Sequence, residues 1–277
     1  MNLVCVKKVF FSIRDIILSV IILYMAEILG MMAGALIYEV MPRNDLSQYL
    51  YIIISTAAYI ALIGWFLKIY ERKVLHINPQ NQRLFSFNNF MNIGIVILVE
   101  LIYIVVTVLL VVFTCSGQWI IAPENRMNLN LFRVFVEFGV GAGIAEEMVF
   151  RNTMLKALEK RFGAGVSIGI TSLAFSLLHI TNTTSLWDAG ITLSFTMILG
   201  IVLCLVRLKT GTILAPMAFH ALWNSVFFGI INIGTKPGSD TIIAYVTESP
   251  LGDLLPLVTS LLLLFVIKKL DLKKATG

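Results

Sequence analysis

The sequence predicts an all-α, polytopic membrane protein with about eight transmembrane helices and with its N- and C-termini in the cytoplasm. Composition carries most of this prediction. Of the 277 residues, 58% are hydrophobic and 13% are charged, which is about half the charged fraction of an ordinary soluble domain. The mean hydropathy is +0.90. So few polar side chains cannot cover a water-soluble domain of this length, and the same numbers exclude intrinsic disorder.

Eight apolar runs are long enough to cross a bilayer, which requires about 20 mostly apolar residues. Because only short connectors separate most of them, we expect one transmembrane domain over residues 1–277, with a motif-bearing core at about 131–232. The expected spans are roughly 15–38, 49–67, 93–115, 131–155, 164–182, 187–206, 210–232 and 251–267.

The basic residues support this topology. If the N-terminus is cytoplasmic, the connectors and ends on that side carry 16 of the 21 Lys and Arg residues, and the other side carries four. The last one, Arg151, lies within the fourth span. Cytoplasmic enrichment of Lys and Arg is what the positive-inside rule predicts. The net charge of +5 therefore reflects orientation in the bilayer, and no nucleic-acid partner is expected, because no basic patch alternates with aromatic residues.

Ionisable residues stand inside several spans, where each costs a few kcal/mol on insertion scales. The first span contains Glu27 and the third contains Glu100. The first span is also too long for a cleavable signal peptide. For both acids the alternatives are a place on a cavity wall, an ion pair with Arg151, or a protonated carboxyl group.

The fourth span contains the densest polar group. Glu147 and Arg151 are four residues apart with the acid first, the favourable order for an ion pair on a helix. Glu146 points about 100° away from Glu147 around the helix axis. One acid can therefore be neutralised while the other faces a different space. A purely structural ion-pair cluster between helices is the alternative.

The fifth span contains Phe175 and His179, and the seventh contains His220 and Asn224. His220 and Asn224 are four residues apart, so they share a helix face, and both can donate hydrogen bonds. Each pair alone is equally consistent with hydrogen bonding between packed helices. Together with the acids they form a set able to hydrolyse a peptide: a carboxylate takes a proton from water, and N–H donors stabilise the oxyanion.

These three groups, in this order on separate spans, resemble the CPBP family of CAAX-prenyl-protease-like and bacteriocin-processing intramembrane proteases, also called the Abi family. The family pattern is Glu-Glu-x-x-x-Arg, then Phe-x-x-x-His, then His-x-x-x-Asn or Asp. The resemblance implies an eight-helix membrane endopeptidase. It implies that Glu146 and His179 activate the attacking water, that His220 and Asn224 stabilise the oxyanion, and that Glu147 and Arg151 are supporting residues together with Phe175.

We expect no metal cofactor; the alternative is a catalytic zinc held by Glu146, His179 and His220. The expected partners are a peptide or lipidated-peptide substrate and the lipid bilayer, and the sequence does not specify an oligomeric state. The abundance of Ile, Asn and Lys favours an AT-rich bacterium, and hence bacterial peptide processing or bacteriocin self-immunity in a bacterial cell membrane. The alternatives are a CAAX-type prenyl-protein endopeptidase, a non-catalytic immunity or scaffold protein, and a transporter that uses the buried acids and His residues as a proton relay.

Overall fold

The computed structural model describes residues 3–76, 90–121, 123–234, 241–247 and 249–272. Within them, six helices are long and apolar enough to cross a membrane, so the predicted all-α membrane fold is confirmed. They are α1 (Leu3–Val40), α2 (Asp45–Lys73), α3 (Phe90–Thr114), α7 (Ala164–Leu178) with the 3-10 turn η5 (His179–Asn182), α8 (Leu186–Thr210) and α10 (Leu251–Lys269).

The other two expected spans, 131–155 and 210–232, fall on helical runs whose winding changes along their length. The first run passes through α4 (Glu124–Arg133), η3 (Val134–Ala142), α5 (Gly143–Glu147), η4 (Met148–Met154) and α6 (Leu155–Phe162). The second passes through α9 (Leu214–Trp223) and η6 (Asn224–Ile230). The segments η3, η4 and η6 are π-helical, and such wide turns are frequently found at functional sites. The total of eight spans stays a prediction.

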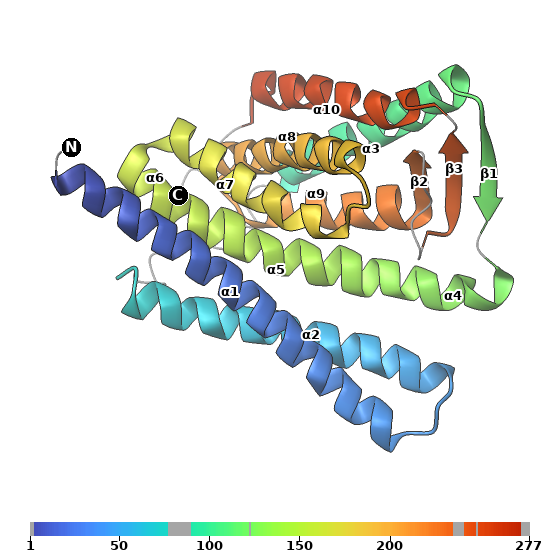
Figure 1. The fold of residues 1–277 in the computed structure, drawn as a ribbon, viewed down its shortest axis with the longest axis horizontal. Helices are drawn as coiled ribbons and strands as arrows, with labels where there is room; N and C mark the ends of the chain where they lie inside the picture. The colour runs from blue at the N-terminus through green and yellow to red at the C-terminus, as the bar shows by residue number, and fades with distance from the viewer. Residues whose placement is uncertain (1–2, 77–89, 122, 235–240, 248, 273–277) are drawn as a thin grey trace.

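A small sheet at one end of the molecule was not predicted. Its strands are β1 (Gly117–Ile121), β2 (Ile231–Gly234) and β3 (Ile243–Thr247), in the order β1-β3-β2. Strand β3 pairs antiparallel with β1 and parallel with β2. The start of α1 and the end of α10 lie at the opposite end (Figure 1). That arrangement is compatible with both termini on one side of a membrane; the cytoplasmic assignment stays a prediction.

Helices α1 and α2 form an antiparallel hairpin that crosses the long α4–α6 run (Figure 1). Asn44 caps α2, because its side-chain oxygen accepts from the backbone N–H of Ser47 at 3.0 Å while the Ser47 hydroxyl accepts from the backbone N–H of Asn44 at 3.1 Å. This reciprocal cap satisfies N–H groups that the first helical turn would otherwise leave unpaired. The cap therefore fixes where α2 begins after the turn that follows α1.

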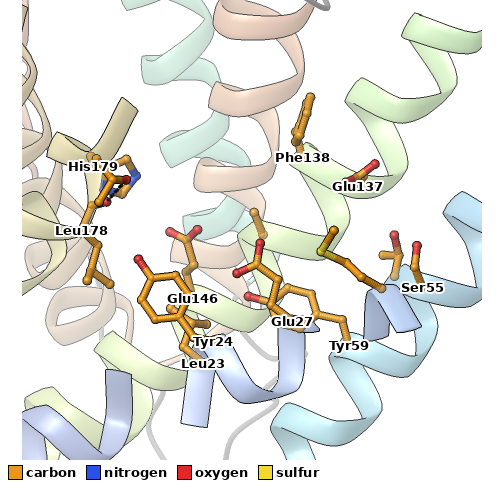
Figure 2. A pocket seen from close by; sticks show the side chains of 14 residues that line it. Leu23, Tyr24, Glu27, Ser55, Tyr59, Glu137, Phe138, Glu146, Leu178 and His179 are labelled. Atoms are coloured by element: carbon orange, nitrogen blue, oxygen red, sulfur yellow. Dashed lines mark hydrogen bonds between the residues drawn. The ribbon is translucent and has the colours of Figure 1, made fainter. Parts of the chain in front are cut away.

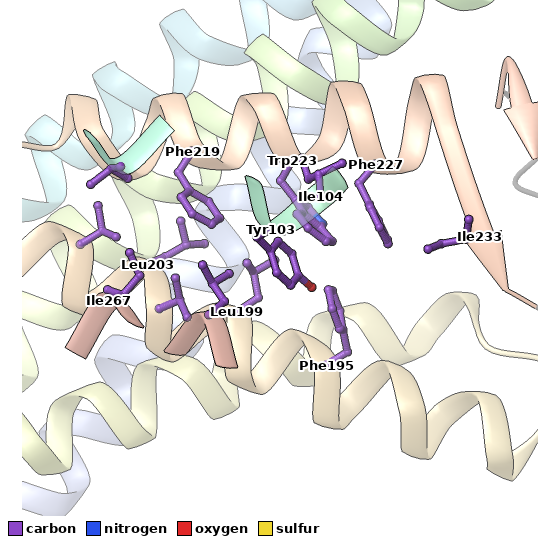
Figure 3. Packing of buried hydrophobic residues seen from close by; sticks show 14 of the residues in the cluster. Tyr103, Ile104, Phe195, Leu199, Leu203, Phe219, Trp223, Phe227, Ile233 and Ile267 are labelled. Carbon is purple, nitrogen blue, oxygen red and sulfur yellow. The ribbon is translucent and has the colours of Figure 1, made fainter. Parts of the chain in front are cut away.

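Buried side chains form two clusters on either side of the long run. One joins α3, α8, α9 and α10 around Trp223, whose ring stacks with Tyr103 and Phe227 (Figure 3). The other joins α1, α2, α7 and the α5–α6 region around Phe150 and Phe175. Large apolar side chains of α3, such as Ile102, Val105 and Leu109, are exposed, as expected where a helix faces lipid.

Glycine lets the long run approach α9 closely. A Cβ at Gly143 would lie 2.9 Å from the backbone nitrogen of Ala221, and one at Gly139 would lie 2.2 Å from the Ser225 hydroxyl. Small residues spaced four apart allow helix backbones to pack at this distance in membranes. The contact sets the α5 acids beside the polar face of α9.

Candidate active site

Two residues of the predicted site line one cavity of about 370 Å³ between the α1–α2 hairpin and the long run (Figure 2). Glu146 from α5 and His179 from the start of η5 both lie on its wall. The lining residues are Leu23, Tyr24, Glu27, Met31, Ser55, Thr56, Tyr59, Glu137, Phe138, Ala142, Glu146, Leu178, His179 and Thr181. Two residues far apart in sequence, from two different motifs, thus share one space.

His179 is held by its own helix. Its Nδ1 lies 2.8 Å from the backbone carbonyl of Phe175, and because a carbonyl can only accept, Nδ1 carries the proton. In the neutral ring Nε2 is then an unprotonated acceptor. The change from α7 to a 3-10 turn at His179 places this ring at the helix end, on the cavity wall.

Glu147, Arg151 and His220 form a buried network behind Glu146. The predicted Glu147–Arg151 ion pair is present, with 2.7 Å between Oε1 and Nη1 and both side chains 0% exposed. The same Oε1 atom accepts a hydrogen bond from His220 Nδ1 at 2.9 Å. Sequence spacing did not predict this contact from the α5–η4 region to α9. Such an outer carboxylate fixes the tautomer and orientation of an imidazole ring.

The network aims the other nitrogen of His220 at Glu146. His220 Nε2 lies 3.9 Å from Glu146 Oε2, which is longer than a hydrogen bond. Oε2 is buried and has no hydrogen-bond partner in the described chain. The Glu146 side chain is 19% exposed and His220 only 2%. Glu146 is therefore the member that reaches the cavity, and a water in contact with both groups would complete the polar contacts of Oε2.

Phe175 fills the space between the basic groups. Its ring centroid lies 4.6 Å from that of His179 and 5.7 Å from that of His220. The Arg151 guanidinium carbon lies 4.3 Å from the same centroid, within the range of a cation–π contact. Phe175, predicted as a supporting residue, thus touches three polar members of the motif set and keeps them apart.

Asn224 lies beside the cavity wall. Its amide nitrogen donates to the Phe138 carbonyl at 2.9 Å, and Phe138 lines the cavity. An oxyanion-stabilising role would require the second amide hydrogen or release of this bond. The catalytic roles of Glu146, His179, His220 and Asn224 stay predictions.

Sequence reasoning offered a cavity-wall position as one alternative for Glu27 and named no other residue of the first two spans as part of the site. The structure places Tyr24 and Glu27 of α1 and Tyr59 of α2 on the cavity wall, with their side chains reaching toward Glu146 (Figure 2). The signal for Glu27 was its charge at membrane depth, and of its three alternatives the cavity wall is the one observed. Glu100 is fully buried in α3 and is not part of the cavity lining, and no ion pair joins it to Arg151 in the described chain.

The alternative zinc set is not assembled in this geometry. Within the described residues, no three His, Cys, Asp or Glu side chains lie close enough together to hold a metal ion. His220 directs Nδ1 to Glu147, and its Nε2 stays 3.9 Å from Glu146. As placed, Glu146, His179 and His220 do not form a zinc site.

Residues 128–226 match a family model described as type II CAAX prenyl endopeptidase Rce1-like. This segment is therefore similar to the CPBP family. The resemblance predicted from the motifs is confirmed, and the matched range, close to the expected core of 131–232, contains every predicted site residue. Comparisons with curated proteins and with solved structures give no match.

The Rce1-like model describes a family of CAAX endopeptidases, which are proteases. Together with the six apolar helices, the match supports an integral membrane protein that resembles a protease family over residues 128–226. Helices α1 and α2, which supply one side of the cavity, lie outside the matched range.

Proposed function

We propose that the protein is an intramembrane endopeptidase that hydrolyses a peptide or lipidated-peptide substrate with a water activated by Glu146 and His179. The observation that carries the proposal is that these two residues share a cavity while His220 is held behind Glu146 by Glu147. An acid, an imidazole acceptor and a second oriented imidazole can supply a general base, an acceptor that holds the water and a donor to the oxyanion.

The proposed reaction begins with a water held between the Glu146 carboxylate and His179 Nε2. Glu146 takes a proton as the water oxygen bonds to the scissile carbonyl carbon. His220, whose Nδ1 is fixed on Glu147, acts as an imidazolium in this step and donates from Nε2 to the resulting oxyanion. Asn224 adds a second donor. Collapse of the tetrahedral intermediate breaks the C–N bond, and the proton on Glu146 passes to the departing amine. The products are a carboxylate and an amine.

Bacterial peptide processing or bacteriocin self-immunity is the biological role we propose, in a bacterial cell membrane. Cleavage of a CAAX-type prenylated peptide is the second candidate, and the Rce1-like family match favours it. The two differ in substrate: the first takes peptides without a lipid, and the second requires an isoprenyl group on a cysteine.

The test uses purified full-length protein in detergent and two synthetic peptide pools, one with a farnesylated cysteine and one without, with products identified by mass spectrometry. We expect cleavage by the wild type and a loss of at least 100-fold in E146Q, because general-base catalysis contributes about 10²–10⁴-fold. E39Q is the matched control, since Glu39 is an exposed acid at the far end of α1. Cleavage by E146Q at the wild-type rate would disprove the assigned base, and a folded wild type that cleaves neither pool would favour the non-catalytic alternative.

A further inference from the structure

Two cavities meet at His179. The second, about 310 Å³, is lined by His179, Asp188 and Phe195 together with Asp253 of α10 and several apolar side chains. Neither lining includes a Lys or Arg, although the chain has 21 of them against 16 acids. Five carboxylates line the two cavities: Glu27, Glu137, Glu146, Asp188 and Asp253. A protein with a net positive charge thus surrounds its proposed catalytic histidine with negative side chains.

Three of these acids have contacts that explain them locally. Glu137 pairs with Arg133 at 3.5 Å. Asp188 accepts from the backbone N–H of Thr184, and Asp253 accepts from the indole of Trp187. Glu146 is assigned to the reaction. Of the five carboxylates, Glu27 is the one that neither these contacts nor the proposed reaction explains.

Glu27 belongs to the first cavity by position and by charge. Glu27, on α1, lines one side of the cavity, and Glu146, on α5, lies across from it (Figure 2). Glu137 and Glu146, which line the same cavity, are acids of the same sign. In the described chain no Lys or Arg forms an ion pair with Glu27. A cleft lined by charges of one sign and walled by apolar protein concentrates its field and attracts the opposite charge.

We propose that Glu27 is a specificity-determining residue that binds a Lys or Arg side chain of the substrate close to the scissile bond. The proposal rests on the proposed endopeptidase function and adds the substrate class: peptides with a positive charge in the segment that enters the cavity. A cationic side chain would offset the repulsion among the cavity acids. It would also position the backbone of the peptide between Glu146 and His179.

The experiment starts from a peptide that the wild-type protein cleaves in the pools described above. Three versions carry Lys, Gln or Glu at each position flanking the cleavage site in turn, and kcat and KM are measured for each. We expect the wild type to prefer Lys over Gln about tenfold at one position, equivalent to about 1.4 kcal/mol, with the difference mainly in KM. In E27Q this ratio should fall to about 1–2.

Charge reversal provides the decisive readout. E27K should prefer the Glu peptide over the Lys peptide, whereas E39Q, on the same helix but outside the cavity, should keep the wild-type ratios. Because each ratio is measured within one variant, reduced folding of a variant does not alter it. Equal cleavage of all three peptides by the wild type, or unchanged ratios in E27Q and E27K, would overturn this inference and leave the proposed function intact. Absence of any cleavage by the wild type would instead overturn the proposed function.

Discussion

Replacing Arg151 with Met tests whether the buried ion pair holds the site together. Arg151 and Glu147 are both 0% exposed and their charged atoms lie 2.7 Å apart. R151M keeps much of the side-chain volume but leaves the Glu147 carboxylate buried, with His220 as its remaining hydrogen-bond donor. Breaking a buried pair by removing one partner costs about 3–5 kcal/mol. For a chain of this size that corresponds to a fall in Tm of roughly 10 °C.

The measurement is thermal unfolding of purified protein in detergent, followed by intrinsic tryptophan fluorescence. The matched control is R43M, which removes the cation of another Glu–Arg pair with the same spacing. Glu39 and Arg43 lie 3.8 Å apart with side chains 68% and 73% exposed, and exposed pairs contribute about 0–1 kcal/mol. R43M should therefore shift Tm by no more than about 2–4 °C.

The double variant E147Q/R151M separates stability from activity. Its neutral amide removes the unpaired charge and can still accept from His220, so we expect it to recover at least half of the Tm lost in R151M. It should not recover cleavage, because the proposed reaction uses the negative charge of Glu147 to stabilise a positively charged His220, and the amide has no charge. If R151M is as stable as R43M, or if the double variant is no more stable than R151M, the ion pair is not what holds these helices in place.

Two further substitutions test the frame around the site. G143V adds a side chain at a position where even a Cβ would lie 2.9 Å from the Ala221 backbone, so we expect α9 to shift and cleavage to fall more than tenfold. The control is G94V, because a Cβ at Gly94 would have nothing within 4 Å, and this variant should retain activity. Equal activity of the two variants would refute the close-packing role of Gly143. E100L removes a fully buried carboxyl group whose two oxygens have no hydrogen-bond partner in the described chain. Burying such a group costs roughly 1–3 kcal/mol, so the variant should unfold at an equal or higher temperature and keep its cleavage activity. A lower Tm would show that Glu100 has a stabilising role.

The part of the site that sequence could predict is the part governed by local helix geometry. The pair of Glu147 and Arg151 follows from a spacing of four residues, and its presence in the structure confirms that inference. Apolar run lengths likewise predicted the membrane helices. Both inferences need only the rise and turn of a single helix.

Contacts between helices could not be predicted in this way. The hydrogen bond from His220 to Glu147 joins residues 73 positions apart, and it depends on the close approach that Gly143 allows. The small sheet depends on pairing β3 with two strands from distant parts of the chain. Sequence periodicity reports which face of an element is buried, but it does not report which element covers that face.

Two parts of the chain line the cavity, and we expect substitutions in them to have different effects on peptide cleavage. The groups assigned to bond cleavage lie on segments within the matched range 128–226, where glycine contacts and a buried ion pair fix them in place. The opposite wall, with Tyr24, Glu27 and Tyr59, comes from the α1–α2 hairpin outside that range. A change on the fixed side should alter the rate of peptide hydrolysis, since it moves groups that act on the scissile bond. A change on the hairpin should alter which peptide is accepted, since those side chains are proposed to contact the substrate without acting on that bond. The same chemistry could therefore serve a different substrate through substitutions confined to the hairpin.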